Sequence, residues 1–303
     1  MALPTFSVTK CSIAPDTTMT IALPDYVIDL QQCIAHALSE DIRSGDVTAR
    51  LVPEHEVNAG VISRDAAVIC GRPWVDEVFR QIDPAVHLDW LVSEGERVVP
   101  NQKLFSLHGP ARALLTGERS ALNFLQTLSG TATAVRQYVD AVAGTGAHIA
   151  DTRKTLPGLR NAQKYAVLCG GGINHRIGLY DGILIKENHI AAAGGIAAAI
   201  ANARALNAGV PLMTEAETLT EARAALAADV DLLLVDDFAL PDLREAVALT
   251  RAHRAAGGKT VIEYSGGATL ENVRGYAECG VDRISIGGIT KHLRAVDLSM
   301  RLC

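Results

Sequence analysis

The sequence lacks the features that mark membrane proteins and proteins with broad anionic partners. The apolar stretch at residues 191–200 is too short, and too interrupted by glycine, to span a bilayer. There is no run of lysine and arginine and no block of like charge, and the formal net charge is −6. We therefore expect no membrane partner and no nucleic-acid partner, and any anionic ligand must be bound locally.

The cysteines show no pattern of a disulfide framework or a zinc site. No C-x-x-C pair occurs, and no histidine lies at zinc-ligand spacing from a cysteine. The first twenty or so residues have no apolar core, so no secretion signal is expected. Reduced thiols in a cytoplasm are the simplest interpretation. The six cysteines are Cys11, Cys33, Cys70, Cys169, Cys279 and Cys303.

The first half of the chain predicts a small mixed domain. With 303 residues, 49% of them apolar, the chain can bury one large core or two modest ones. Residues 1–24 suggest a loose arm, residues 27–41 carry a helical apolar stripe, and residues 57–110 contain short β-like segments. A long helical stretch at 113–143, which we expect to be broken at Ser129-Gly130, links this domain to the next.

The second half alternates short apolar runs with helical stretches, which predicts a parallel sheet with crossover helices. Polar residues follow each run at its C-terminal end, the catalytic face of an α/β barrel. An open sheet would concentrate ligands at one switch point, so six contributing strands favour an incomplete barrel of fewer than eight strands. The predicted strands are 148–150, 182–185, 211–213, 231–235, 260–262 and 283–286.

A basic window between residues 153 and 186 predicts a pocket for a small polyanion. It holds six basic side chains against one acid, Asp181, in a chain that is acidic overall. Arginine grips carboxylate or phosphate in a bidentate manner, and lysine adds a compact charge. A solvated basic face is the alternative. The six are Arg153, Lys154, Arg160, Lys164, Arg176 and Lys186.

Glu215 and Asp236 close two successive strands and could share one Mg²⁺, which takes one or two carboxylates and completes its shell with water and phosphate oxygens. The alternative, equally supported by the acids alone, is that each pairs with a pocket lysine or arginine.

Ser265-Gly266-Gly267 and Gly287-Gly288 follow the last two strands, where glycine lets backbone N–H groups approach a phosphate. Taken alone, either glycine pair is more typical of a plain turn.

The motifs in these segments resemble the quinolinate phosphoribosyltransferases. The resemblance covers nearly the whole chain beyond the first twenty or so residues. It rests on LLTGERSALNFLQTLSG (114–130), DTRKTLPGLR (151–160), KYAVLCGGGINHRIGLYDGILIKENHI (164–190), EAETL (215–219), Asp236, SGG (265–267) and ISIGGIT (284–290).

The resemblance implies an α/β fold with an N-terminal α/β sandwich and an incomplete, six- or seven-stranded parallel α/β barrel. The implied parts are an arm at 1–24, the sandwich with its linking helix at 25–143, the barrel at 144–290, and a segment at 291–303 that returns to the sandwich. It also implies a homodimer in which Arg119, otherwise an ordinary exposed helix charge, reaches the partner subunit's site.

The implied reaction joins quinolinate to phosphoribosyl pyrophosphate with Mg²⁺ and releases CO₂. By position, Arg119, Arg153, Lys154, His175 and Arg176 would bind the diacid, while Lys154 and Lys186 would neutralise carboxylate and pyrophosphate charge. Glu215 and Asp236 would hold ribose hydroxyls and Mg²⁺. The remaining substrate-binding positions are Thr152, Ser265, Gly266, Gly267, Ile286, Gly287 and Gly288.

Four positions depart from the usual family pattern: Glu187, Met213, Asp237 and Tyr264. Tyr264 is the most consequential, because a ring beside the phosphate loop could narrow the site.

Two alternatives to the named activity remain: a paralogue with another acceptor, such as the type found with molybdate transport, and a non-catalytic sensor of a phosphorylated metabolite. Retention of Lys154, Lys186, Glu215 and Asp236 argues against the sensor.

Overall fold

The computed structural model describes residues 21–303, so most of the arm predicted at 1–24 lies outside the described residues. The described chain divides into two compact units. One consists of Gly178–Ile262, and the other of Ile21–Ile177 together with Glu263–Cys303. In the part of the chain that the structure covers, no helix combines the length and apolarity of a membrane span.

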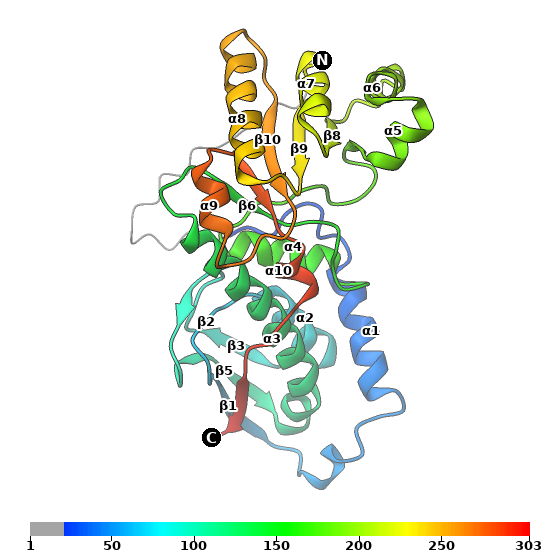
Figure 1. The fold of residues 1–303 in the computed structure, drawn as a ribbon. Coiled ribbons are helices and arrows are strands. Elements are labelled where there is room, and N and C mark those ends of the chain that lie inside the picture. Colours follow the sequence, from blue (N-terminus) through cyan, green and yellow to red (C-terminus); the bar gives the residue numbers. More distant parts are fainter. Residues whose placement is uncertain (1–20) are drawn as a thin grey trace. The chain divides into compact units, whose positions relative to one another are not determined.

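The larger unit contains a four-stranded antiparallel sheet in the order β12-β1-β5-β3 (Figure 1). Along β1, alternate residues such as Ala59 and Val61 are buried, as expected when one face of a strand packs on a core. The strands of this sheet are β1 (Glu56–Ser63), β3 (His87–Trp90), β5 (Lys103–Pro110) and β12 (Leu298–Leu302), and β2 (Ala67–Val68) and β4 (Arg97–Val98) form a separate pair. The accompanying helices are α1 (Leu30–Ile42), the 3₁₀ turn η1 (Ala49–Leu51), α2 (Arg72–Ile82) and α3 (Ala111–Ala141).

Helix α3 runs without interruption, so the break predicted at Ser129-Gly130 is wrong. A Cβ on Gly130 would lie 2.3 Å from the carbonyl oxygen of Arg294. The glycine therefore permits the segment before β12 to approach the helix backbone closely. Close packing, rather than a helix end, explains this residue.

Six parallel strands form the second sheet, in the order β6-β11-β10-β9-β8-β7. All six predicted strands are confirmed, and the sheet agrees with the fold class expected from the sequence. The strands are β6 (His148–Ala150), β7 (Ile183–Ile185), β8 (Leu212–Ala216), β9 (Leu232–Asp236), β10 (Val261–Ser265) and β11 (Arg283–Ser285). The helices are α4 (Arg160–Cys169), α5 (Glu187–Ala193), α6 (Ile196–Ala205), α7 (Leu219–Ala227), α8 (Leu240–Ala255), α9 (Val273–Glu278) and α10 (Gly288–Lys291).

Candidate active site

A buried ion pair lies at the end of β6 in the larger unit. Lys164 Nζ of α4 lies 2.6 Å from Asp151 Oδ1, and both side chains are 0% exposed. Lys164 belongs to the basic window that predicted a ligand pocket, and for this residue the prediction is wrong. Its charge is neutralised inside the protein, because a buried lysine requires a partner.

The same ion pair fixes the segment that carries His175. Asp151 accepts hydrogen bonds from Asn174 Nδ2 (2.7 Å) and from the backbone N–H of His175 (2.8 Å). Lys164 donates to the carbonyl oxygen of His175 at 3.1 Å. Ile173 also forms a parallel bridge with Ala150 of β6. His175 is thus positioned through its backbone, whatever its side chain binds.

The His175 ring faces Glu263 of β10, with Nε2 and Oε1 3.5 Å apart. His175 Nδ1 accepts a hydrogen bond from the backbone N–H of Arg176 at 2.7 Å. In the neutral ring the proton therefore lies on Nε2, the nitrogen that faces Glu263. Sequence reasoning missed Glu263, although an acid directly after the apolar run at 260–262 was a usable signal.

Both acids of this cluster have raised pKa values. Burial raises the pKa of Glu263 to about 7, with Ser285 and Arg283 opposing the shift and Asp151 adding to it. Burial likewise raises the pKa of Asp151 to about 6, against the attraction of Lys164 and the hydrogen bonds that it accepts. A desolvated carboxyl group favours its neutral form unless charges or donors compensate.

Lys154 lies against the turn after β11. Its backbone N–H donates to Thr152 Oγ1 at 3.0 Å, and its carbonyl oxygen accepts from Thr290 Oγ1 at 2.8 Å. A Cβ on Gly287 would lie 2.9 Å from Lys154 Cδ, so the glycine leaves room for the lysine side chain. The Lys154 residue itself is exposed, and its charge is accessible to a ligand.

The Ser265-Gly266-Gly267 loop has the backbone of a glycine-specific turn, with φ values of 117° and 52° at the two glycines. Helix α9 begins only at Val273, so the loop does not lead directly into a helix. Gly287-Gly288 does precede a short helix, α10, and Ile286 before it is buried. Only the second loop therefore leads directly into a helix.

The other unit, Gly178–Ile262, carries Lys186, Glu215 and Asp236. Lys186, which follows β7, lies 2.5 Å from Glu215 of β8, and the lysine side chain is 46% exposed. Asp236 ends β9 two residues after Leu234, the register partner of Glu215. Side chains two residues apart point to one face of a strand, so Glu215 and Asp236 share a face.

Two other carboxylates lie close to that of Glu215. Atoms of Glu187, Glu215 and Glu217 lie within 4.8 Å of one another, a group that does not include Asp236. Glu187 is one of the four departures from the family pattern. Carboxylate oxygens suit a hard cation such as Mg²⁺.

The other departures have structural explanations. Tyr264 is buried and stacks on Tyr276 of α9, with ring centroids 4.0 Å apart. It neighbours Glu263 on the strand and so points to the opposite face, which removes the expected narrowing of the phosphate loop. Met213 packs in the apolar cluster with Leu232 and Leu234. Asp237 has φ 56°, a backbone region that Asp and Asn tolerate better than most residues.

Arg119 is exposed on α3, and none of the ion pairs found within residues 21–303 includes it. Arg153 and Arg176 are half-buried. The structure therefore brings together Thr152 with Lys154 and His175 with Glu263 in one unit, and Lys186 with Glu215 in the other. Arg119 stays outside both groups.

Two family models cover most of the chain. The N-terminal domain of quinolinate phosphoribosyl transferase matches residues 46–129, and its C-terminal domain matches residues 131–301. A nicotinate-nucleotide pyrophosphorylase, described as carboxylating, from Mycobacterium leprae is 41% identical over 89% of this chain and 95% of its own length. The corresponding chloroplastic protein of Arabidopsis thaliana is 34% identical over 98% of this chain and 89% of its own.

Solved structures agree with these relatives. The nicotinate-nucleotide pyrophosphorylase from Francisella tularensis superposes with a TM-score of 0.88 at 41% identity, covering 95% of this chain and all of that one. The enzyme from Ehrlichia chaffeensis superposes with a TM-score of 0.83 at 37% identity, over 90% of this chain and 98% of its own. The similarity thus extends over both sheets.

Proposed function

We propose, from the premise that this chain belongs to the quinolinate phosphoribosyltransferase family, that it transfers phosphoribosyl from phosphoribosyl pyrophosphate to quinolinate. The products are nicotinate mononucleotide, pyrophosphate and CO₂, a step of NAD biosynthesis. The observation that carries the proposal is the buried frame of Asp151 and Lys164, which holds His175 by its backbone.

Quinolinate is a dianion, and its proposed partners are Arg153, Lys154, His175 and Arg176. Lys154 is exposed beside Gly287 and can contact a carboxylate without breaking an internal ion pair. The backbone of His175 cannot shift without breaking two hydrogen bonds, and the ring accepts a third from the backbone N–H of Arg176, so the ring is pre-positioned. Thr152 Oγ1 accepts a hydrogen bond from the backbone N–H of Lys154 and so supports the loop that carries this lysine.

Phosphoribosyl pyrophosphate is proposed to bind Lys186, Glu215 and Asp236, with its 5′-phosphate on residues 265–267 and 286–288. Glu215 and Asp236 share a strand face and present oxygen atoms, so they fit Mg²⁺, which when bound would neutralise pyrophosphate charge. Lys186, paired with Glu215 in the described structure, can turn to a pyrophosphate oxygen because it is half exposed.

The proposed reaction develops negative charge on the leaving group. The pyridine nitrogen attacks the anomeric carbon as pyrophosphate leaves, and charge builds on the leaving oxygens. The ammonium groups of Lys154 and Lys186 are proposed to stabilise that charge. The N-ribosylated ring is cationic, so its positive nitrogen stabilises the electron pair left on C2 when the C2 carboxylate departs as CO₂, and C2 then takes up a proton from solvent.

The enzyme is proposed to work in the cytoplasm as a homodimer. Arg119 of each subunit is proposed to act in the active site of the partner subunit. Mixing Arg119→Ala with Lys154→Ala subunits tests the dimer. Each variant alone is expected to be nearly inactive, and exchange should restore part of the activity. No recovery after verified subunit exchange would exclude the shared site.

The activity itself is tested by mass spectrometry of the products. Purified protein is incubated with phosphoribosyl pyrophosphate, Mg²⁺ and either quinolinate or nicotinate. Formation of nicotinate mononucleotide and CO₂ from quinolinate alone is the expected result. Product from nicotinate alone, or from neither acid, would contradict the proposal and favour a paralogue with another acceptor.

A further inference from the structure

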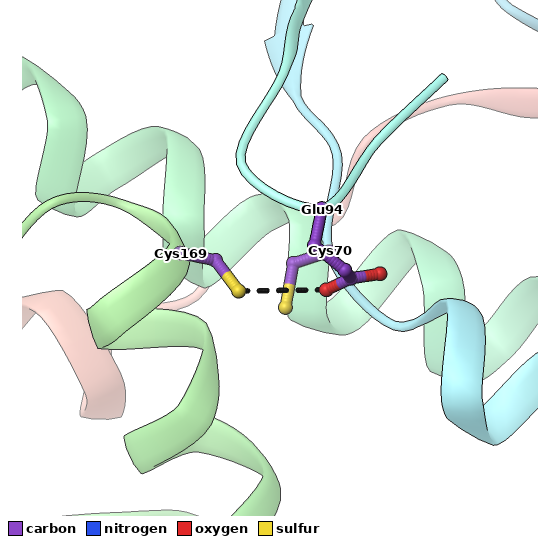
Figure 2. A group of neighbouring side chains, drawn as sticks. All are labelled: Cys70, Glu94 and Cys169. Atoms are coloured by element: carbon purple, nitrogen blue, oxygen red, sulfur yellow. Dashed lines mark hydrogen bonds between the residues drawn. The ribbon is translucent and has the colours of Figure 1, made fainter. Parts of the chain in front are cut away.

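Two thiols and a carboxylate that are far apart in the sequence, and that have no role in the proposed reaction, meet inside the larger unit (Figure 2). Cys70 follows β2, Glu94 lies in the turn between β3 and β4, and Cys169 is the last residue of α4. Their ligand atoms all lie within 4.8 Å of one another, and both cysteines are 0% exposed. Cys169 Sγ donates to Glu94 Oε2 at 3.4 Å.

Two of the three residues are held in place by hydrogen bonds, Cys70 through its backbone and Glu94 through its carboxyl group. The backbone N–H of Cys70 donates to Ser129 Oγ at 3.0 Å, and Ser129 Oγ lies 3.2 Å from the carbonyl oxygen of Cys70. The Glu94 carboxylate accepts from the backbone N–H groups of Gly71 (3.0 Å) and Arg72 (2.7 Å). Outer hydrogen bonds of this kind orient the ligands of protein metal sites.

The third side chain is fixed by close backbone packing. Gly95 has φ +77°, and a Cβ there would lie 3.0 Å from the carbonyl oxygen of Cys169. A Cβ on Gly170 would lie 2.5 Å from Val135 Cβ of α3. These two glycines allow the turn and the end of α4 to meet, so Cys169 is brought to the cluster by the fold itself.

The donor set and its spacing fit one metal in particular. Two sulfur atoms and one carboxylate oxygen suit Zn²⁺ and disfavour Mg²⁺. In a tetrahedral zinc site, bond lengths of about 2.3 Å to sulfur and about 2.1 Å to oxygen put neighbouring S and O ligands about 3.6 Å apart. The Cys169–Glu94 separation of 3.4 Å is close to that value. We propose that Cys70, Glu94 and Cys169 form a zinc site, with water as the fourth ligand.

Binding of a metal ion would displace protons from this site. Glu94 accepts bonds from two backbone N–H groups and a thiol, so the orientation of its carboxyl group is fixed. One Zn²⁺ would replace the protons of the two thiols, and two protons would be released to solvent.

A bound ion would tie the end of α4 to the start of α2. Cys169 is followed by Gly170, Gly171 and Gly172, and then by the segment that carries His175. Zinc bound only by the folded protein raises the melting temperature, by mass action. The site is therefore structural and distinct from the carboxylates proposed for Mg²⁺.

Titration of the full-length, chelator-treated protein with Co²⁺ and then Zn²⁺, in excess Mg²⁺, tests the site. The expected result is one Co²⁺ per chain with a thiolate charge-transfer band, loss of that band on Zn²⁺ addition, and a higher melting temperature. Cys70→Ser and Cys169→Ser should each remove the band, and Glu94→Gln should weaken binding at least tenfold. Cys279→Ser, a buried thiol elsewhere, is the matched control and should bind as the unaltered protein does.

A band that persists in Cys70→Ser, or no band in the unaltered protein, overturns the proposal. Because a buried variant can misfold, proton release is also measured on the unaltered chain. Two protons per Zn²⁺ support the site, and none contradicts it. A Cys70–Cys169 disulfide peptide from untreated protein would instead make the pair a redox couple, and so also overturns a zinc site.

Discussion

Two lysine–carboxylate pairs lie near the ends of strands of the same parallel sheet. Their N–O distances are nearly equal, but their lysine side chains differ in exposure. Lys164–Asp151 and Lys186–Glu215 lie at 2.6 Å and 2.5 Å. The first pair is 0% exposed on both sides, whereas the Lys186 side chain is 46% exposed. A buried pair holds its neighbours in place, while an accessible one can exchange its partner for a substrate. Exposure, rather than distance, separates the structural lysine from the one that is proposed to bind substrate.

The largest effect is expected from Lys164→Met. Removing one partner of a buried pair leaves Asp151 uncompensated, which should cost about 3–5 kcal/mol of unfolding free energy and should loosen the 174–176 segment. Urea denaturation followed by circular dichroism measures the loss. A loss below about 1 kcal/mol would place this pair in the class of surface ion pairs and remove the contrast.

Lys186→Met is the matched variant at the accessible pair. Its stability should fall by less than the loss of about 3–5 kcal/mol expected for Lys164→Met, because Lys186 is half exposed even though Glu215 is 7% exposed. Its kcat should fall by about 10²-fold or more, because a cation proposed to lie near the leaving group is lost. Steady-state kinetics together with urea denaturation test both parts. An unchanged kcat would show that Lys186 has no role in catalysis.

Glu263→Gln tests how a buried carboxyl group without a lysine partner affects the pH dependence of stability. The folded-state pKa of about 7 exceeds the ordinary value of 4.5, so the folded protein binds the extra proton and stability falls as pH rises from about 4.5 through about 7. The glutamine variant lacks this dependence and should gain about 1–3 kcal/mol relative to the unaltered protein above pH 7. Melting temperatures from pH 5 to pH 8 measure it, and parallel curves for the two proteins would refute the assignment.

The smallest effect is expected at a fully superficial pair. Arg223 and Glu245 lie 2.5 Å apart, with side chains 55% and 48% exposed. Arg223→Ala should change the unfolding free energy by less than about 1 kcal/mol, and kcat should not change. A larger loss would show that distance predicts the strength of an ion pair better than burial does.

Much of the fold could be predicted from the sequence because periodicity reports burial. All six strands of the parallel sheet fall where the apolar runs predicted them, and Lys186 and Glu215 come together as neighbouring strand ends should. The break expected in α3 was wrong because Gly130 serves a contact with Arg294, which lies far along the chain. A single sequence does not record such contacts.

The site was harder to predict than the fold, for a related reason. Lys164 and Lys186 are the same residue type in one basic window, and only the packing of α4 separates them. Glu263 directly follows the run predicted at 260–262, but the strand continues to Ser265 and buries this acid, which the sequence alone did not reveal. Cys70, Glu94 and Cys169 lie far apart in the sequence and come together only in the folded chain.

The pairing of β12 with β1 determines when the antiparallel sheet can be completed during protein synthesis. Ser63 pairs with Leu298, more than two hundred residues later. At roughly 5–20 residues per second, the ribosome needs roughly ten to fifty seconds to deliver that partner. During this time one edge of β1 has no strand beside it, and an unpaired edge invites association between chains. The whole Gly178–Ile262 unit is synthesised within the same interval, before the last strand of the antiparallel sheet, β12, is made.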